Sequence, residues 1–357
     1  MAILGAQQRL DNLIGGKPWG NGEDGAATPS SDPNTRTTAT GSGTSLTLGS
    51  GALANGDYFV IHQTRKTSAA GKWEIACVAS GGGTTSIVTT KSLVNTYTTG
   101  AQVIQFDLNT IVEISAHSIT AWTGSTGGLA VFCGKDSITV SGNLTGTGNG
   151  YKLGVGESGT PTSASDAESS YGDPGTAATG AGQGANDSSG AGGGYGTAGG
   201  VGINGAAAGA QHGSADLTVL DFGGGGGGGL SNPIGGNGGD SGAAVIFITK
   251  NFIASAATVI LNGAAGSTAP GDSRGGGGGS GGACLVVCET ATIGSNKITA
   301  TGGAGGGGTI SGGTGGVGRI AVHHSGTVSA STITNPDFED VTDTTLVETG
   351  SNFFALL

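Results

Sequence analysis

Between residues 45 and 123, short apolar runs alternate with clusters of turn-forming residues. The clearest run, Tyr58–Gln63, is rich in the β-branched and aromatic residues that strands prefer. Runs of this kind recur about every 8 to 15 residues, a spacing typical of a barrel, a sandwich or the first turns of a solenoid. The strands expected in this part of the chain are 45–48, 58–63, 72–78, 86–89, 103–106, 111–114 and 118–122.

The residues before this β-rich part carry a different pattern. Within residues 1–20, Ala6–Ile14 can form two helical turns with its apolar residues on one side, and the two glycines that follow would end them. We therefore expect this segment to anchor the chain to a partner or to other copies. Residues 20–45 are rich in Gly, Ser, Thr, Asp, Asn and Pro, which predicts a loop.

A longer unit repeats from about residue 124 onward. Each copy consists of small residues, a strand, a turn, a second strand and then a glycine-rich run. Copies open near Gly128, Gly242, Gly282 and Gly318, and the last three openings are 40 and 36 residues apart. Because one copy has too few large side chains to close a core, neighbouring copies must stack to bury their apolar faces. The longer first interval is interpreted as containing an insertion at about 148–230.

Composition narrows the fold class. Glycine supplies 79 of the 357 residues, and only 10% of the residues are charged. Glycine costs about 1 kcal/mol per helical position relative to alanine, which disfavours long helices. The chain has no Gly-X-Y period along its length, so a collagen triple helix is excluded. The sequence therefore predicts an all-β fold, a glycine-rich β-solenoid or β-helix-like stack preceded by a smaller β-rich region.

The long glycine runs allow two interpretations. An isolated run of this kind is usually a flexible linker. Here the runs recur after the second strand of a repeat, which favours an ordered state. The ordered alternative is an extended, left-handed helix of the polyglycine II type with three residues per turn, whose backbone groups must pair with neighbouring chains. The structural glycines expected at such contacts are Gly226, Gly277 and Gly306.

Glycine runs that alternate with short β-segments resemble the glycine-rich adhesins at the tips of some bacteriophage tail fibres. The pattern is also similar to glycine-rich β-helical surface proteins of bacteria. Both resemblances cover about 124–325 and rest on Gly223–Gly229, Gly275–Gly279, Gly302–Gly308 and the strands before them. The adhesin resemblance implies polyglycine helices packed side by side, with variable loops between them that contact a host receptor. The intact strands between the runs depart from the adhesin pattern and favour the solenoid.

Charge and hydropathy limit the partners of the chain. The formal net charge is −11, and the 13 Lys and Arg residues are scattered singly, without the basic stripe that phosphate binding needs. No apolar stretch approaches the length of a membrane helix. We therefore expect no nucleic-acid partner and no membrane insertion. The start of the chain does not resemble a secretion leader, which would fit a virion component released by cell lysis.

The patterns of known catalytic and cofactor sites are not found. Matches to G-x-G-x-x-G have no helix after them, and no P-loop is present, so no cofactor is predicted. The five histidines are spread out, and His323 and His324 would face opposite sides of a strand, so no metal site is predicted. Cys284 and Cys288 would lie on one face of a single strand, too far apart to bridge, and are interpreted as small buried hydrophobes. No catalytic residue is predicted.

Three tyrosines lie among small residues of the expected insertion. Tyrosine in such a loop is a common recognition residue, because it gives rigid contact area with a polar tip. The alternative is that these tyrosines cover the solenoid. The expected receptor contacts are Tyr151, Tyr171 and Tyr195.

These features predict a non-enzymatic structural or adhesive protein, in the first place a virion component (tail fibre, spike or capsid-surface protein) that contacts a host surface. One alternative is a subunit of a bacterial extracellular filament or surface layer, and another is a polysaccharide depolymerase built on a β-helix. The expected partners are other copies of the chain, other virion or filament proteins, and a cell-surface glycan or protein, at a virion-surface or extracellular location. The expected divisions are 1–44 (anchor segment and polar loop), 45–123 (β-rich domain), 124–325 (glycine-rich repeats) and 326–357 (C-terminal tail).

Overall fold

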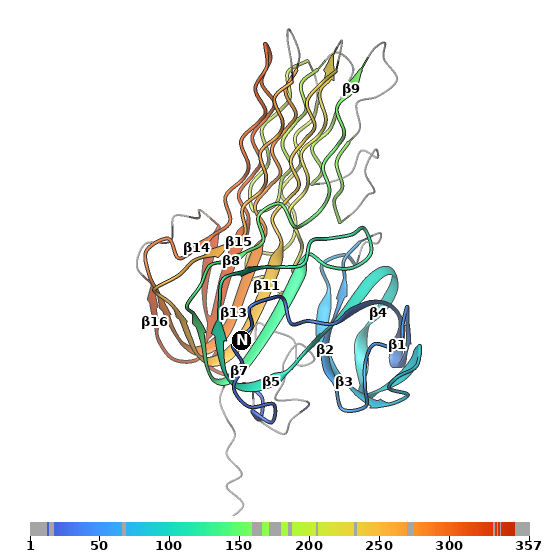
Figure 1. Cartoon of the computed structure of the whole chain (residues 1–357), viewed down its shortest axis with the longest axis vertical. Helices are drawn as coiled ribbons and strands as arrows, with labels where there is room; N and C mark the ends of the chain where they lie inside the picture. The colour runs from blue at the N-terminus through green and yellow to red at the C-terminus, as the bar shows by residue number, and fades with distance from the viewer. Residues whose placement is uncertain are drawn as a thin grey trace, which may run out of the picture.

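The computed structural model consists of strands and extended segments (Figure 1). It describes residues 13, 18–65, 69–158, 166–170, 180–184, 188–204, 206–231, 234–269, 274–330, 333, 335 and 337–346. These residues form no helix, and three of their four sheets are parallel, which confirms the all-β prediction. The helical turns expected in the first 14 residues lie outside the described residues except at Leu13.

The first strands form an antiparallel sheet, drawn in blue to cyan in Figure 1. The expected strands 86–89 and 103–106 are the two ends of one long strand. In order across the sheet, the strands are β1 (Arg36–Leu48), β4 (Ser86–Phe106), β2 (Tyr58–Gln63) and β3 (Trp73–Ser80).

The prediction of a loop over 20–45 is wrong for its second half. Arg36 pairs with Ile104 and Thr37 with Val103, so β1 begins nine residues before the expected strand. The start of β1 alternates buried and partly exposed residues. Its threonines are β-branched, which suits a half-exposed strand at a sheet edge despite their polar character.

Most strands of the repeat region belong to one parallel sheet, called here the large sheet (Figure 1). Each of its strands lies beside the strands of the neighbouring copies, as stacking of the repeats predicts. The order is β17 (Phe338–Thr342), β15 (Arg319–His324), β13 (Ala283–Ile293), β11 (Ala244–Ala254), β7 (Leu129–Val140) and β5 (Leu108–Ile114), with β16 (Val328–Ala330) also beside β13.

A second parallel sheet, called the small sheet, takes the second strand of the copies that open near Gly128, Gly242 and Gly282, together with one strand that precedes them. Side chains alternate along the large sheet, so Val245 and Phe247 pack toward the small sheet while Ile246 faces the other way. Val259 and Ile298 complete this inner core from the small sheet. The order is β14 (Ile298–Thr299), β12 (Val259–Ile260), β8 (Leu144–Thr145) and β6 (His117–Ser118).

The copies of the repeat are held in register. Ala244 pairs with Leu129 on one side and with Ala283 on the other, and Ala283 pairs with Arg319. The expected repeat is confirmed, but the spacing is 39 and then 36 residues rather than 40 and 36. A shift of one residue would turn every apolar side chain of a strand to its other face, so burial selects this register.

Large aromatic side chains cover the opposite face of the large sheet. Ile246 on this face shares one buried cluster with Trp73, Trp122, Tyr151 and Phe222. The Trp122 ring lies edge-on to both the Tyr151 and the Phe222 rings, with 6.0 Å between centroids in each pair. This cluster joins the antiparallel sheet and the large sheet.

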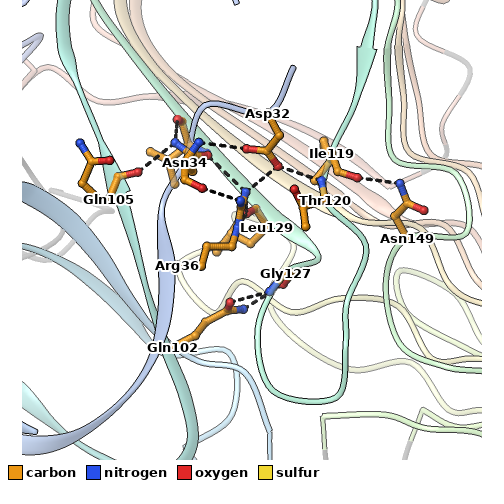
Figure 2. Close-up of polar contacts among 11 residues, drawn as sticks. Asp32, Asn34, Arg36, Gln102, Gln105, Ile119, Thr120, Gly127, Leu129 and Asn149 are labelled. Carbon is orange, nitrogen blue, oxygen red and sulfur yellow. Dashed lines mark hydrogen bonds and ion pairs between the residues drawn. The ribbon is translucent and has the colours of Figure 1, made fainter. Parts of the chain in front are cut away.

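Polar contacts tie the same two sheets together (Figure 2). The guanidinium of Arg36 on β1 donates to the Leu129 carbonyl at the start of β7, at 2.8 Å. The side-chain amide of Gln102 on β4 donates to the Gly127 carbonyl at 3.0 Å and accepts from the Gly127 amide at 2.9 Å. The turn that precedes β7 is therefore held from both sides.

Several strands lie outside the divisions expected from sequence. The parallel sheets begin at Leu108 rather than near residue 124, and β16 and β17 lie within the expected C-terminal tail. Ala27, in the expected polar loop, lies along the edge of β5 and donates to the Ile111 carbonyl at 2.8 Å. β16 and β17 are short and have few apolar residues, so they carry little periodic signal and only their pairing reveals them.

The four cysteines are free and buried. Cys284 and Cys288 lie on the β13 face that packs toward the small sheet, together with Val286. Burial raises the pKa of the Cys288 thiol to about 12. The interpretation of this pair as unbridged, buried small hydrophobes is confirmed.

Candidate functional site

Extended segments rise from the parallel sheets and lie side by side in the upper half of Figure 1. Backbone amides of one segment donate to carbonyl oxygens of another, largely outside any strand ladder. We call this assembly the glycine bundle. Its runs are 150–158, 166–170, 180–184, 188–196, 197–202, 206–212, 223–230, 235–242, 261–269, 274–282, 300–307 and 310–318.

The partners of each central run repeat every three residues. In run 274–282, Gly275 donates to Ile310 at 2.9 Å, and Gly278 donates to Gly313 of the same neighbouring run, also at 2.9 Å. The two residues between them donate to two other runs, and their carbonyls accept from further runs. The described runs bonded to 274–282 are 188–196, 223–230, 235–242, 261–269, 300–307 and 310–318.

Backbone packing in the bundle leaves no room for side chains at the inner positions. A Cβ at Gly277 would overlap the carbonyl oxygen of Ala191, and a Cβ at Gly226 would overlap that of Gly277. A Cβ at Gly306 would overlap the Ser267 carbonyl oxygen. The three glycines expected at close contacts all lie at such contacts.

The outer runs carry a side chain at every third residue. In run 235–242, Asn237 is exposed and Asp240 half-buried, while the glycines between them are buried. Run 310–318 repeats the arrangement with Ser311 and Thr314. A local Gly-Gly-X triplet in both runs is the sequence signal for this arrangement, and it does not extend along the whole chain.

Runs 188–196 and 223–230, within the segment interpreted from sequence as an insertion (about 148–230), lie at the centre of the bundle. Run 188–196 contacts six other described runs, and run 223–230 does the same. The Gly224 amide donates to the Gly194 carbonyl at 3.0 Å, and the Gly227 amide to the Ala191 carbonyl at 2.8 Å. The described part of the expected insertion therefore packs within the bundle.

A buried ion pair joins the antiparallel sheet to the base of the bundle. Arg65, which follows β2, pairs with Glu168 of run 166–170. The Glu168 carboxylate also accepts from the Trp122 indole at 2.9 Å and from the Lys152 amide at 2.9 Å. Glu168 has no exposed surface, so its charge depends on these partners.

A second buried carboxylate, Asp221, lies at the same level. It accepts a hydrogen bond from the Ser170 hydroxyl at 2.7 Å, and its backbone amide donates to the Tyr195 hydroxyl at 3.2 Å. His212 Nε2 lies 3.7 Å from Oδ2 of the Asp221 carboxylate. Burial raises the pKa of Asp221. No solvent reaches Asp221 or Glu168, so neither carboxylate is open to a polysaccharide chain.

Two of the three expected receptor tyrosines are buried. Tyr151 and Tyr195 have no exposed surface, and the Tyr151 hydroxyl donates to the Thr64 carbonyl in the core. Burial raises the pKa of both phenols. The receptor-contact prediction is wrong for both residues, because the small residues around them belong to the packed bundle rather than to a surface loop. Tyr171 lies outside the described residues.

Exposed apolar side chains occur near the end of the bundle that is farthest from the sheets. Val155 is 50% exposed and precedes β9 (Glu157–Ser158), which Figure 1 labels near the top. Val201 is 72% exposed and Ile203 is 51% exposed, and the Ile203 amide donates to the Ser189 hydroxyl at 2.9 Å. Ile234, at 45% exposure, opens run 235–242. Sequence reasoning did not single out these residues, because no local pattern shows which turns are distal.

Other classes of site are not found in the described part of the chain. No cluster of three or more His, Cys, Asp or Glu side chains is placed to hold a metal ion there. No helix long and apolar enough to cross a membrane occurs among the same residues. No protein-family model matches the chain, and no curated protein matches its sequence.

His62 links the antiparallel sheet to the segment before the bundle, and it predicts a pH dependence. Its Nε2 lies 2.7 Å from the Leu220 carbonyl oxygen, and its Nδ1 lies 2.9 Å from the Thr64 hydroxyl. Burial lowers the His62 pKa from 6.5 to about 4. The unfolded chain takes up this proton below pH 6.5 while the folded chain does not, so stability falls as the pH drops from 6.5 toward 4.

We expect the His62→Gln variant to lose less stability over that pH interval, by roughly 3 kcal/mol, since a pKa unit corresponds to about 1.4 kcal/mol. Urea unfolding at several pH values measures the difference. His324→Gln is the control, because His324 pairs with the half-exposed carboxylate of Asp340. Equal pH slopes for wild type and His62→Gln would contradict the prediction.

Proposed function

We propose that the chain is a glycine-rich β-solenoid whose outward loops form a polyglycine II bundle. Two observations support this architecture. Three of the four repeats give one strand to the large sheet and one to the small sheet, and the partners of run 274–282 recur every three residues. A helix with three residues per turn points every third amide and carbonyl group in the same direction, which gives this period of three.

We further propose a non-enzymatic structural and adhesive role, with the distal end of the bundle as the contact surface for a host cell. The observation that carries the proposal is the packing of central runs among six neighbours through backbone hydrogen bonds. Such packing makes a stiff support whose sequence is free to vary only at outward positions and distal turns. Exposed Val201 and Ile203 supply apolar contact area near these turns.

Under the same proposal, the chain is part of a tail fibre, spike or capsid surface of a virion. Its role requires no cofactor. Its partners would be other copies of the chain, other virion proteins, and a glycan or protein of the host surface. A filament or surface-layer subunit and a polysaccharide depolymerase are the competing functions, and they differ in what the protein co-purifies with and in whether it releases sugar.

The double variant Val201→Ser, Ile203→Ser is expected to reduce binding of the purified chain to host cells at least fivefold. Loss of these two exposed apolar side chains removes about 1 kcal/mol or more of the free energy gained when they are buried against a partner. Cell pull-down with labelled protein measures binding. The control Ala304→Ser changes an exposed side chain on the flank of the bundle and should bind like wild type.

Retention of full binding by the double variant would overturn the distal contact surface. Co-purification with infectious particles supports the virion role, whereas co-purification with filaments supports the first alternative. Release of soluble sugar from host polysaccharide would overturn the non-enzymatic role.

A further inference from the structure

An open pocket of about 440 Å³ lies on the antiparallel sheet, away from the glycine bundle's distal end. Its walls come from both ends of β1, from the β4 residues Thr99 to Ala101, and from the turn that contains Gly124 and Ser125. Small-molecule sites commonly have volumes of about 300–1,000 Å³, so this pocket has the size of a ligand site.

The walls of the pocket carry hydroxyl groups that the fold does not use. The side chains of Thr38, Thr40, Thr47 and Thr99 line it, and their hydroxyls make no hydrogen bond to another described residue. Gly49 leaves space for the Thr38 hydroxyl, because a Cβ at residue 49 would overlap the Thr38 hydroxyl oxygen. A hydroxyl both donates and accepts, so it can bond to a ligand hydroxyl in either sense.

The floor of the pocket is apolar and carries no net charge. Ala39, Leu48 and Ala101 supply buried apolar surface. The one charged lining residue, Arg65, is paired with buried Glu168, so its positive charge is already balanced. An anionic ligand would therefore gain little from Arg65, and a ligand with hydroxyls at its edge and C–H groups on its face fits better.

The wall formed by Gly124 and Ser125 is fixed before any ligand binds. The turn that contains Gly124 and Ser125 ends at Gly127, which exchanges two hydrogen bonds with the Gln102 side chain (Figure 2). The Thr126 amide donates to the Thr123 hydroxyl, and the Thr126 carbonyl accepts from both the Thr123 hydroxyl and the Thr123 amide. These bonds fix the conformation of the turn. A preformed wall lowers the ordering cost of binding.

We propose that this pocket binds one or two rings of an uncharged saccharide. The proposal does not depend on the role of the distal end, because the two surfaces share no residue. It assigns a carbohydrate contact to the antiparallel sheet, in addition to whatever the bundle recognises.

The test is saturation-transfer difference NMR of the full chain with a panel of neutral disaccharides, namely maltose, cellobiose, lactose, chitobiose and mannobiose, and with a uronic-acid disaccharide. At least one neutral member should bind at millimolar concentration, and the affinity should fall about tenfold in Thr47→Val, Thr99→Val, because each unmatched polar contact costs about 1–3 kcal/mol. Valine keeps the β-branched shape, so both strands should fold. Thr44→Val, an exposed threonine of β1 outside the pocket, is the matched control.

Chemical-shift changes in the wild-type chain should centre on the amides of Thr38, Gly100 and Ala101, which gives a readout that needs no variant. The proposal is overturned if no neutral disaccharide binds, if only the charged one binds, or if binding survives the double substitution in a folded protein. Unchanged saccharide binding in the distal variant Val201→Ser, Ile203→Ser would show that the pocket acts separately from the bundle.

Discussion

Gly277→Val is expected to destabilise the chain by about 3 kcal/mol or more, at the upper end of the cost of overpacking. A Cβ at this position would overlap the Ala191 carbonyl oxygen of a neighbouring run. The run cannot shift to make room for the side chain, because run 274–282 is hydrogen-bonded to six other runs. The closest analogy is the collagen triple helix, where one larger residue at a glycine position disrupts the packed chains.

The measurement is urea or thermal unfolding, and the chain supplies a matched pair of adjacent glycines as its control. A Cβ at Gly306 would overlap the Ser267 carbonyl oxygen, whereas a Cβ at Gly307 would meet its nearest neighbour, the Thr268 hydroxyl, at 3.3 Å. Gly306→Ala should therefore cost much more than Gly307→Ala. Amides of residues 275–279 should also be protected from hydrogen exchange. Equal stabilities within the pair, together with fast exchange, would contradict the packed bundle.

Arg65→Met is expected to lower the free energy of unfolding by about 3–5 kcal/mol. The substitution leaves the Glu168 carboxylate buried with a negative charge and with only neutral donors, Trp122 Nε1 and the Lys152 amide. A buried charge that loses its partner keeps its desolvation cost, and this pair joins two parts of the molecule. The double variant Arg65→Met, Glu168→Gln should lose less than the sum of the two single variants.

An exposed ion pair provides the comparison. Lys250 and Glu289 lie 3.8 Å apart with side chains 41% and 43% exposed. Lys250→Met should change stability by less than about 1 kcal/mol, because solvent screens such pairs. If Arg65→Met were no more destabilising than Lys250→Met, the buried pair would not hold the bundle to the antiparallel sheet.

The prediction of strands from sequence succeeded where propensity and burial agree. β2 coincides with the expected 58–63, and the parallel pairing of β11 with β13 follows the expected repeat. The prediction failed where a strand is polar. β1 begins in a threonine-rich segment that also has the composition of a loop.

The sequence by itself determined the all-β class and the repeat, because these follow from local propensity and periodicity. It favoured ordered glycine runs over flexible linkers, because the runs recur at matched positions, but it left both interpretations open. Only the tertiary structure decided which runs are neighbours. A glycine run carries no side chain that could select a partner, so its place is set by the strands at its base, as run 274–282 is placed by β13. The burial of Tyr151 and Tyr195 was likewise decided by the tertiary structure. A tyrosine among small residues can lie on a surface or in a core, and here the runs around both side chains close over them.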